Sequence, residues 1–217
     1  MLREVLFNDL YTIIIVVSLA IIVSAKLLNF NRFTDFLRLF GTSNYLRIYF
    51  KGHTFLDAFD ILLFLNFCIN GVLTGLLTYT CFVQKLDLNA LLFIKLGAFL
   101  GSWVLLKILL KIGIGYLFDI PKLFHSYVFQ QLSFLNFLGV ALLPLNCLLI
   151  FGTLNHHILM VTTLIISVVI LMIGLMKSIK TYQKLLINNF FYFILYLCTL
   201  EIGPYIVLYK LFSLDIN

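Results

Sequence analysis

The sequence predicts an all-α protein, a polytopic bundle of transmembrane helices that forms one domain over residues 1–217. Hydrophobic residues make up 63% of the chain and charged residues only 11%, whereas soluble domains have about 45–50% and about 25%. Several apolar stretches also reach the roughly 20 residues that a membrane-spanning helix needs. We expect six spans in contact with lipid, at Asn8–Ala25, Asp57–Val83, Asn89–Leu110, Leu132–Phe151, His157–Met176 and Asn188–Phe212.

The first span is expected to be retained, because Met1–Leu10 carries Glu4 and Asp9 beside Arg3 and has no signal-peptide pattern. The next segment, Asn29–Lys51, is too polar to cross a membrane. It alternates aromatic residues with cations, which favours interfacial helices on the cytoplasmic leaflet. Such a segment either anchors the chain to the membrane surface or offers a docking surface to a partner. Its candidate interfacial cations are Arg32, Arg38, Arg47 and Lys51.

The second span begins with two carboxylates, Asp57 and Asp60. The positive end of a helix dipole favours acidic side chains in the first turn. We therefore assign these two residues a structural role rather than a catalytic one.

Small and amide side chains recur at helical spacing in the middle spans. Small residues four positions apart let spanning helices approach closely, and amides can hydrogen-bond between helices. The glycines predicted to serve helix packing are Gly71, Gly75, Gly97 and Gly101. The amides expected to hydrogen-bond across helices are Asn66, Asn70, Asn136 and Asn146.

The distribution of cations predicts the orientation. Most of the 15 Lys and Arg residues fall in three alternate loops, after the first, third and fifth spans. Because cytoplasmic loops carry the excess of Lys and Arg, we expect both termini outside the cytoplasm. The net charge of +6 is explained in this way and does not indicate a nucleic-acid partner.

The last predicted span carries the most reactive groups. Glu201 lies near its middle, and Pro204 follows and removes a backbone hydrogen bond. A charged residue at the centre of a span costs about 2.5–3.5 kcal/mol, so we expect Glu201 to face the protein interior. It either pairs with Lys95 of the third span or stays neutral while Lys95 extends to the interface. Other candidate partners are Tyr196 and Tyr205.

Motifs for enzymes and metal sites are missing from the sequence. It contains no P-loop, no G-x-S-x-G, no H-E-x-x-H and no G-x-G-x-x-G. The adjacent His156 and His157 would need further ligands, and the remaining two histidines are expected on the opposite side of the membrane. The four cysteines lack metal-ligand spacing. We therefore predict no catalysis, no cofactor and no bound metal.

One stretch resembles a known family. Phe190–Lys210, and in particular its core Tyr196–Pro204, is similar to the end of the domain-of-unknown-function family 4271. Similar features are the basic, aromatic region Phe36–Phe50, the helix with Gly97 and Gly101, and the turn Leu142–Leu145. The resemblance implies a multi-pass inner-membrane protein of Bacteroidota and supplies no catalytic residue.

Two hypotheses from different classes follow. The first is a non-enzymatic inner-membrane subunit that packs against partner proteins in a complex, and the implied lineage points to secretion or gliding machinery. The alternative is a small proton-coupled transporter in which Glu201 titrates and Pro204 breaks the helix. A transporter needs a polar, water-accessible cavity that reaches Glu201.

Overall fold

The computed structural model describes residues 8–39, 57–82, 90–117, 121–152 and 155–188, and every regular element in these ranges is a helix. Five of the helices are long and apolar enough to span a membrane, so the prediction of an all-α polytopic bundle is confirmed. The expected sixth span begins where the last described helix ends and otherwise lies outside the described residues. The helices are α1 (Asn8–Leu28), α2 (Phe30–Leu37), α4 (Ala58–Phe82), α5 (Ala90–Leu117), α6 (Pro121–Phe151) and α7 (His156–Asn188).

Three helices are much longer than the sequence predicted, and α1 is slightly longer. α5 continues to Leu117, α6 begins at Pro121 and α7 ends at Asn188. The expected ends were placed where the apolar pattern stops, but polar residues continue a helix equally well when they find partners. At about 1.5 Å per residue, α6 and α7 are about 46–50 Å long. Because a hydrocarbon core is about 30 Å thick, one end of each can extend beyond the bilayer.

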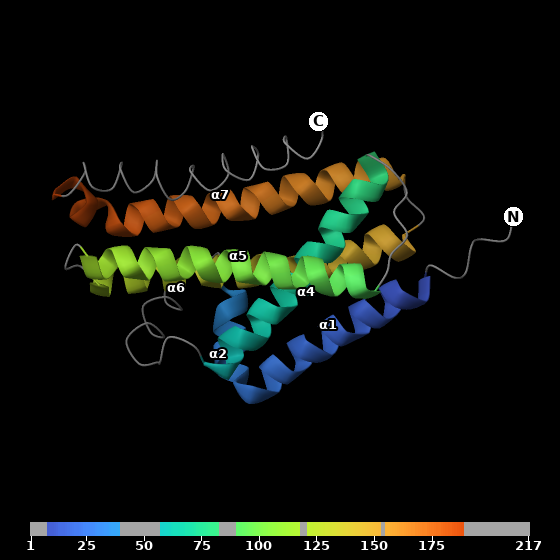
Figure 1. Ribbon diagram of the computed structural model, residues 1–217, viewed down its shortest axis with the longest axis horizontal. Helices are drawn as coiled ribbons and strands as arrows, with labels where there is room; N and C mark the ends of the chain where they lie inside the picture. The colour runs from blue at the N-terminus through green and yellow to red at the C-terminus, as the bar shows by residue number, and fades with distance from the viewer. Residues whose placement is uncertain (1–7, 40–56, 83–89, 118–120, 153–154, 189–217) are drawn as a thin grey trace, which may run out of the picture.

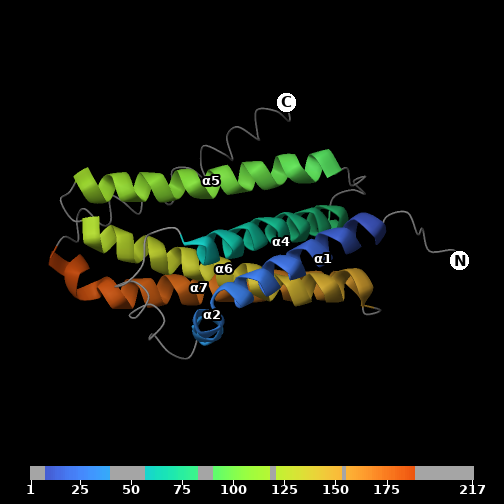
Figure 2. The same ribbon diagram turned by 90° about the horizontal axis from the view of Figure 1, so that it is seen from below.

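The helices are arranged around α4, which packs against α1, α5, α6 and α7 (Figure 1). Successive spans run in opposite directions, so the ends that border the three cationic loops gather at one end of the bundle. We call this the cationic end. Among the described helices, α5 packs mainly against α4 and α6 and forms one edge (Figure 2).

α2 lies across the long axis of the bundle, and Figure 2 shows it end-on. Its apolar face packs against the bundle, and Phe33 and Phe36 on this face are buried. The ring of Phe36 lies 6.1 Å from that of Phe59 on α4 and 5.9 Å from that of Phe137 on α6. This orientation fits the interfacial helix expected at the start of Asn29–Lys51, and the rest of that segment, from residue 40, lies outside the described residues.

The closest helix contacts occur at glycines that the sequence did not single out. A Cβ atom on Gly139 of α6 would lie 2.5 Å from the Cα of Phe67 on α4. The predicted packing glycines Gly71 and Gly101 lie where α4 meets α5. A Cβ added at either glycine would lie 3.6 Å from the nearest side-chain atom of the other helix, which is ordinary van der Waals contact. A Cβ added at Gly75 or Gly97 would have no atom of another described helix within 4 Å.

Candidate functional site

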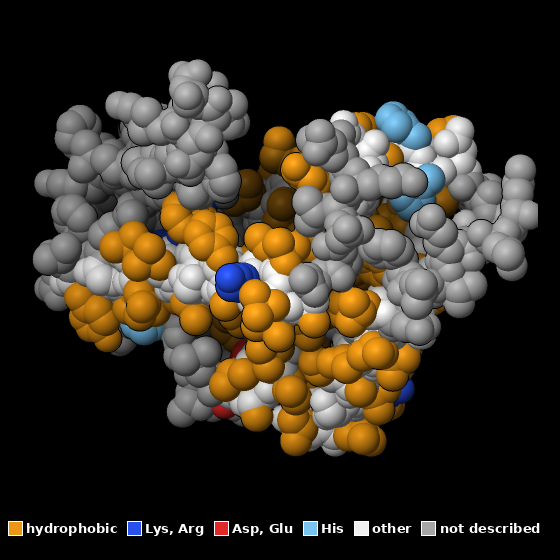
Figure 3. All heavy atoms as spheres, turned by 45° about the vertical axis from the view of Figure 1, so that its right-hand side comes forward, with side chains coloured by type: hydrophobic (Ala, Val, Ile, Leu, Met, Phe, Trp, Pro, Cys, Tyr) orange, Lys and Arg blue, Asp and Glu red, His pale blue; other side chains and the backbone are white. Residues whose placement is uncertain are grey.

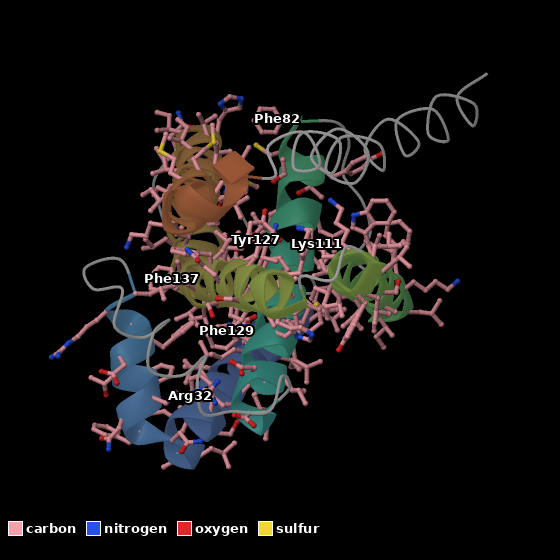
Figure 4. The ribbon with its side chains drawn as sticks, turned by 90° about the vertical axis from the view of Figure 1, so that its left-hand side faces the viewer. Arg32, Phe82, Lys111, Tyr127, Phe129 and Phe137 are labelled. Atoms are coloured by element: carbon pink, nitrogen blue, oxygen red, sulfur yellow. The ribbon has the colours of Figure 1, made fainter. Side chains whose placement is uncertain are left out.

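The cationic end contains a buried ion-pair cluster, which we call the Arg32 clamp. Arg32 of α2 is only 3% exposed. Its Nη1 lies 2.8 Å from Asp57 Oδ2 and its Nη2 lies 2.6 Å from Asp60 Oδ2. Its guanidinium also lies over the ring of Phe59, 4.7 Å from the centroid. One side chain thus joins α2 to the first turn of α4 (Figure 4).

The prediction for Arg32 is wrong, because this side chain is buried in the protein. We expected this residue among the cations that face lipid headgroups, but it is buried inside the protein. It lies on the same side of α2 as Phe33 and Phe36, and the carboxylates that neutralise it follow 25 and 28 residues later. Burial of a charge is tolerated when such partners surround it. Asp57 and Asp60 keep the structural role predicted for them and gain this second one, whereas Arg38, just beyond α2, is exposed.

A second polar cluster, the amide network, lies deeper in the bundle and joins α1, α4 and α6. Ser18 Oγ donates to Asn66 Oδ1 at 2.6 Å, and Asn70 Nδ2 donates to Ser18 Oγ at 2.6 Å. Asn146 Nδ2 donates to Asn70 Oδ1 at 3.3 Å. Thr74 Oγ1 lies 2.9 Å from Asn146 Oδ1. All five side chains are buried.

Polar groups therefore follow one side of α4 for most of its length. Asn136 Nδ2 lies 3.5 Å from the carbonyl oxygen of Asp60, and Thr78 Oγ1 lies 3.5 Å from Met160 Sδ. From Asp60 to Thr78 the helix rises about 27 Å, close to the thickness of a hydrocarbon core. The prediction that asparagines hydrogen-bond across helices is confirmed for Asn66, Asn70, Asn136 and Asn146.

Other cations at this end are also held by the protein. Lys111 of α5 is buried, donates to Gln131 Oε1 and lies 5.3 Å from the ring centroid of Tyr127. Lys177 of α7 donates to the carbonyl oxygen of Leu39 at 3.0 Å. The sequence analysis had used these lysines only as orientation signals. The burial of Lys111 could have been suspected from its position between apolar residues.

The outward face of α5 has a regular pattern of its own, which we call the α5 stripe. The residues alternate in spacing between four and three positions, which is the heptad repeat of packed helices. The stripe combines small and polar residues with leucines, and all are exposed: Leu91, Lys95, Ala98, Ser102, Leu105 and Leu109. Sequence analysis missed the stripe because the two faces of α5 are similarly apolar.

Several predicted site residues cannot be placed. Glu201, Pro204, Tyr196 and Tyr205 lie outside the described residues, as do Arg47 and Lys51. Lys95 is exposed, and its pairing with Glu201 stays a prediction.

The structure places the adjacent histidines, and it also shows whether potential metal ligands gather among the described residues. His156 and His157 begin α7, and the His157 ring meets that of Phe82 edge-on at 5.0 Å. Within the described ranges, no three His, Cys, Asp or Glu side chains lie close enough to hold a metal ion.

Comparison with known proteins identifies the family. The model of the domain of unknown function DUF4271 matches residues 11–212, and the chain belongs to this family. The resemblance based on Tyr196–Pro204 is thus confirmed at the level of the family. No curated protein and no solved structure matches the chain. Family and fold together establish a multi-pass membrane protein.

Proposed function

We propose that the protein is a non-enzymatic subunit of an inner-membrane complex, and that it packs against a spanning helix of a partner protein through the α5 stripe. The observation that carries this proposal is the contrast between the stripe and its surroundings. More than half of the most apolar part of α4 is buried, whereas none of the corresponding part of α5 is. α5 nevertheless presents small and polar residues at a packing repeat.

The composition of the α5 stripe suits a protein neighbour better than lipid. Ala98 and Ser102 lie one turn apart, and small residues at this spacing let another helix approach closely. Lys95 lies about 7.5 Å inside the start of the helix, where a carboxyl or amide of a partner would lower the cost of its charge. On the face that Figure 3 shows, the described side chains are mainly hydrophobic, with few Lys or Arg side chains.

The remaining parts of the proposal rest on the sequence. The alternation of cationic loops supports two periplasmic termini. The family resemblance supports a bacterial inner membrane, and the lineage it implies is the ground for secretion or gliding machinery.

The test is to enlarge the small residues of the stripe. Ala98→Trp and Ser102→Trp are compared with Val168→Trp, which changes an exposed position of α7. Each tagged variant is extracted from its own membranes in lipid nanodiscs, and native mass spectrometry measures the fraction of the chain bound to a partner. We expect the stripe variants to lose about tenfold of the partner, which corresponds to about 1.4 kcal/mol, and Val168→Trp to retain it.

Two outcomes would refute the proposal. One is a wild-type chain that is recovered without any stoichiometric membrane partner. The other is an equal effect of the α5 and α7 variants. If another part of the same chain covers the stripe, Ala98→Trp will lower the Tm of the purified single chain, and the proposal fails in that way too.

The proton-coupled transporter is the second candidate, and the polar side of α4 favours it. Hydrogen-bonding groups from Asp60 to Thr78 extend over about 27 Å, and Glu201 would supply the titrating group. Glu201→Gln keeps the shape of the side chain and removes its titration. If the purified protein moves protons in liposomes and Glu201→Gln accumulates normally but stops this flux, the transporter replaces the subunit.

A further inference from the structure

The interface between α4 and α6 contains buried polar atoms that need a partner from outside the described residues. Gln130 and Asn136 of α6 are 2% and 1% exposed. Neither Gln130 Nε2 nor Asn136 Oδ1 has a hydrogen-bond partner there. An unpaired buried polar group costs about 1–3 kcal/mol. Two on the same helix therefore point to a ligand that can both donate and accept.

The surroundings fit water. A buried water molecule typically has two to four polar partners. Ser133, between the two amides, is buried and donates to the carbonyl oxygen of Phe129 at 2.8 Å, so its oxygen can still accept a hydrogen bond. Near Asn136 lies the backbone of Asp60, whose carboxylate belongs to the Arg32 clamp. The three α6 residues follow one another at intervals of three and lead from the cationic end into the bundle.

Beyond Asn136, a close contact between α6 and α4 follows the three residues Gln130, Ser133 and Asn136. One turn beyond Asn136, Gly139 approaches Phe67 so closely that an added Cβ would lie 2.5 Å from the Phe67 Cα. A water molecule cannot pass between two backbones at this separation. Farther along, the Asn70 and Asn146 side chains bond to each other.

From this geometry we propose that water enters the α4–α6 interface from the cationic end, binds at Gln130, Ser133 and Asn136, and stops at the Gly139–Phe67 contact. The interface is then hydrated on one side of the membrane only. The Arg32 clamp borders this water, which connects its carboxylates to the aqueous phase at the cationic end. The inference is independent of the proposed docking at α5.

Cysteine accessibility tests the proposal directly. In a full-length chain with Cys68, Cys81, Cys147 and Cys198 replaced by alanine, single cysteines are placed at Ser133 and Asn136. Matched controls are Leu142→Cys, buried on the same helix beyond the Gly139–Phe67 contact, and Ile61→Cys, exposed on the lipid side beside Asp60. A membrane-impermeant thiosulfonate is then added to spheroplasts and, separately, to inverted vesicles.

The cysteine thiolate attacks such a reagent and displaces its sulfinate, and the thiolate forms in contact with water. We therefore expect Ser133→Cys and Asn136→Cys to react about tenfold faster than both controls. The reaction should occur from one side only, the side on which a tag inserted between α2 and α4 is also accessible. Equal rates at Asn136→Cys and Leu142→Cys would overturn the proposal, as would reaction from the opposite side.

A second variant keeps the test valid if the cysteine proteins fold poorly. Gln130→Met preserves the shape of the side chain and removes its amide. If water binds there, the substitution deletes real hydrogen bonds and the Tm falls below that of the wild type. If the site is dry, the substitution removes an unpaired polar group, and an unchanged or higher Tm would overturn the proposal.

Discussion

α4 and α5 are both long apolar helices with similar sequences, but they differ in burial and in the direction of their polar side chains. α4 has neighbours on several sides and turns its polar residues inward, where Asn70 bonds to Ser18 and Asn146. Among the described helices, the neighbours of α5, namely α4 and α6, lie along one side, and its polar Lys95 and Ser102 are exposed. Overall hydrophobicity therefore places a helix in the membrane, but the direction of its few polar residues decides whether it forms the centre or the edge.

α4 and α5 also differ in the polar interactions that hold each of them to its neighbouring helices. α4 is fixed at the cationic end by the Arg32 clamp and along its length by the amide network. α5 is fastened at the cationic end, where Lys111 donates to Gln131 Oε1 of α6. On its outer face, Ser102 donates to the carbonyl oxygen of Phe99 on its own helix. If this difference is real, substitutions around α4 should destabilise the purified protein, and matched ones on the outer face of α5 should not.

The largest effect is expected at the Arg32 clamp. Arg32→Met leaves the buried Asp60 and the half-buried Asp57 without the guanidinium, and breaking a buried ion pair costs about 3–5 kcal/mol. We expect this variant to accumulate poorly in membranes and to have a much lower Tm in detergent. The control is Arg38→Met, since Arg38 is exposed.

The clamp also has a rescue experiment. Adding Asp57→Asn and Asp60→Asn to Arg32→Met removes the repulsion between the carboxylates and should restore part of the lost stability. If Arg32→Met is as stable as Arg38→Met, the clamp does not hold α2 to α4.

The next largest change in Tm is expected from alanine substitutions at two glycines, one tightly packed against another helix and one not. At Gly139 an added methyl group would collide with the backbone of α4, and overpacking of this kind costs about 1–3 kcal/mol. A methyl group added at Gly97 would meet no atom of another described helix within 4 Å, and alanine is a better helix former by about 0.8–1.0 kcal/mol. Gly139→Ala should therefore lower the Tm, and Gly97→Ala should raise it or leave it unchanged. Two shifts of the same sign would contradict the comparison.

The sequence was sufficient for whatever depends on local composition. Five of the six expected spans, the opposite directions of successive spans and the asparagine contacts follow from apolar length, cation placement and the cost of an unpaired amide in a membrane. It was also sufficient to select Asp57 and Asp60 as structural. Each of these follows from a residue and its near neighbours along the chain.

The remaining features depend on contacts between distant segments. Arg32 looked like an interfacial cation because its carboxylates lie on another helix, and Gly139 looked like any glycine because the close backbone of Phe67 belongs to α4. The packing stripe of α5 was hidden for a related reason: in a helix that is apolar all round, the pattern becomes visible only when the other face is seen to be occupied.

The smallest effect tests the amide network, and it separates specific bonding from general packing. Asn70→Ala and Asn146→Ala each remove a side chain and leave a cavity, so single variants alone are ambiguous. A double-mutant cycle isolates the interaction between the two residues. Such couplings inside membranes average about 0.6 kcal/mol and reach about 1.7 kcal/mol, and the several hydrogen bonds around Asn70 favour the upper part of this range. The control cycle combines Asn70→Ala with Ser102→Ala, whose hydroxyl bonds within α5, and its coupling should be close to zero. Both cycles are measured by reversible unfolding in mixed micelles. If the Asn70–Asn146 coupling is no larger than the control, the network contributes only packing, and α4 and α5 differ in burial but not in polar bonding.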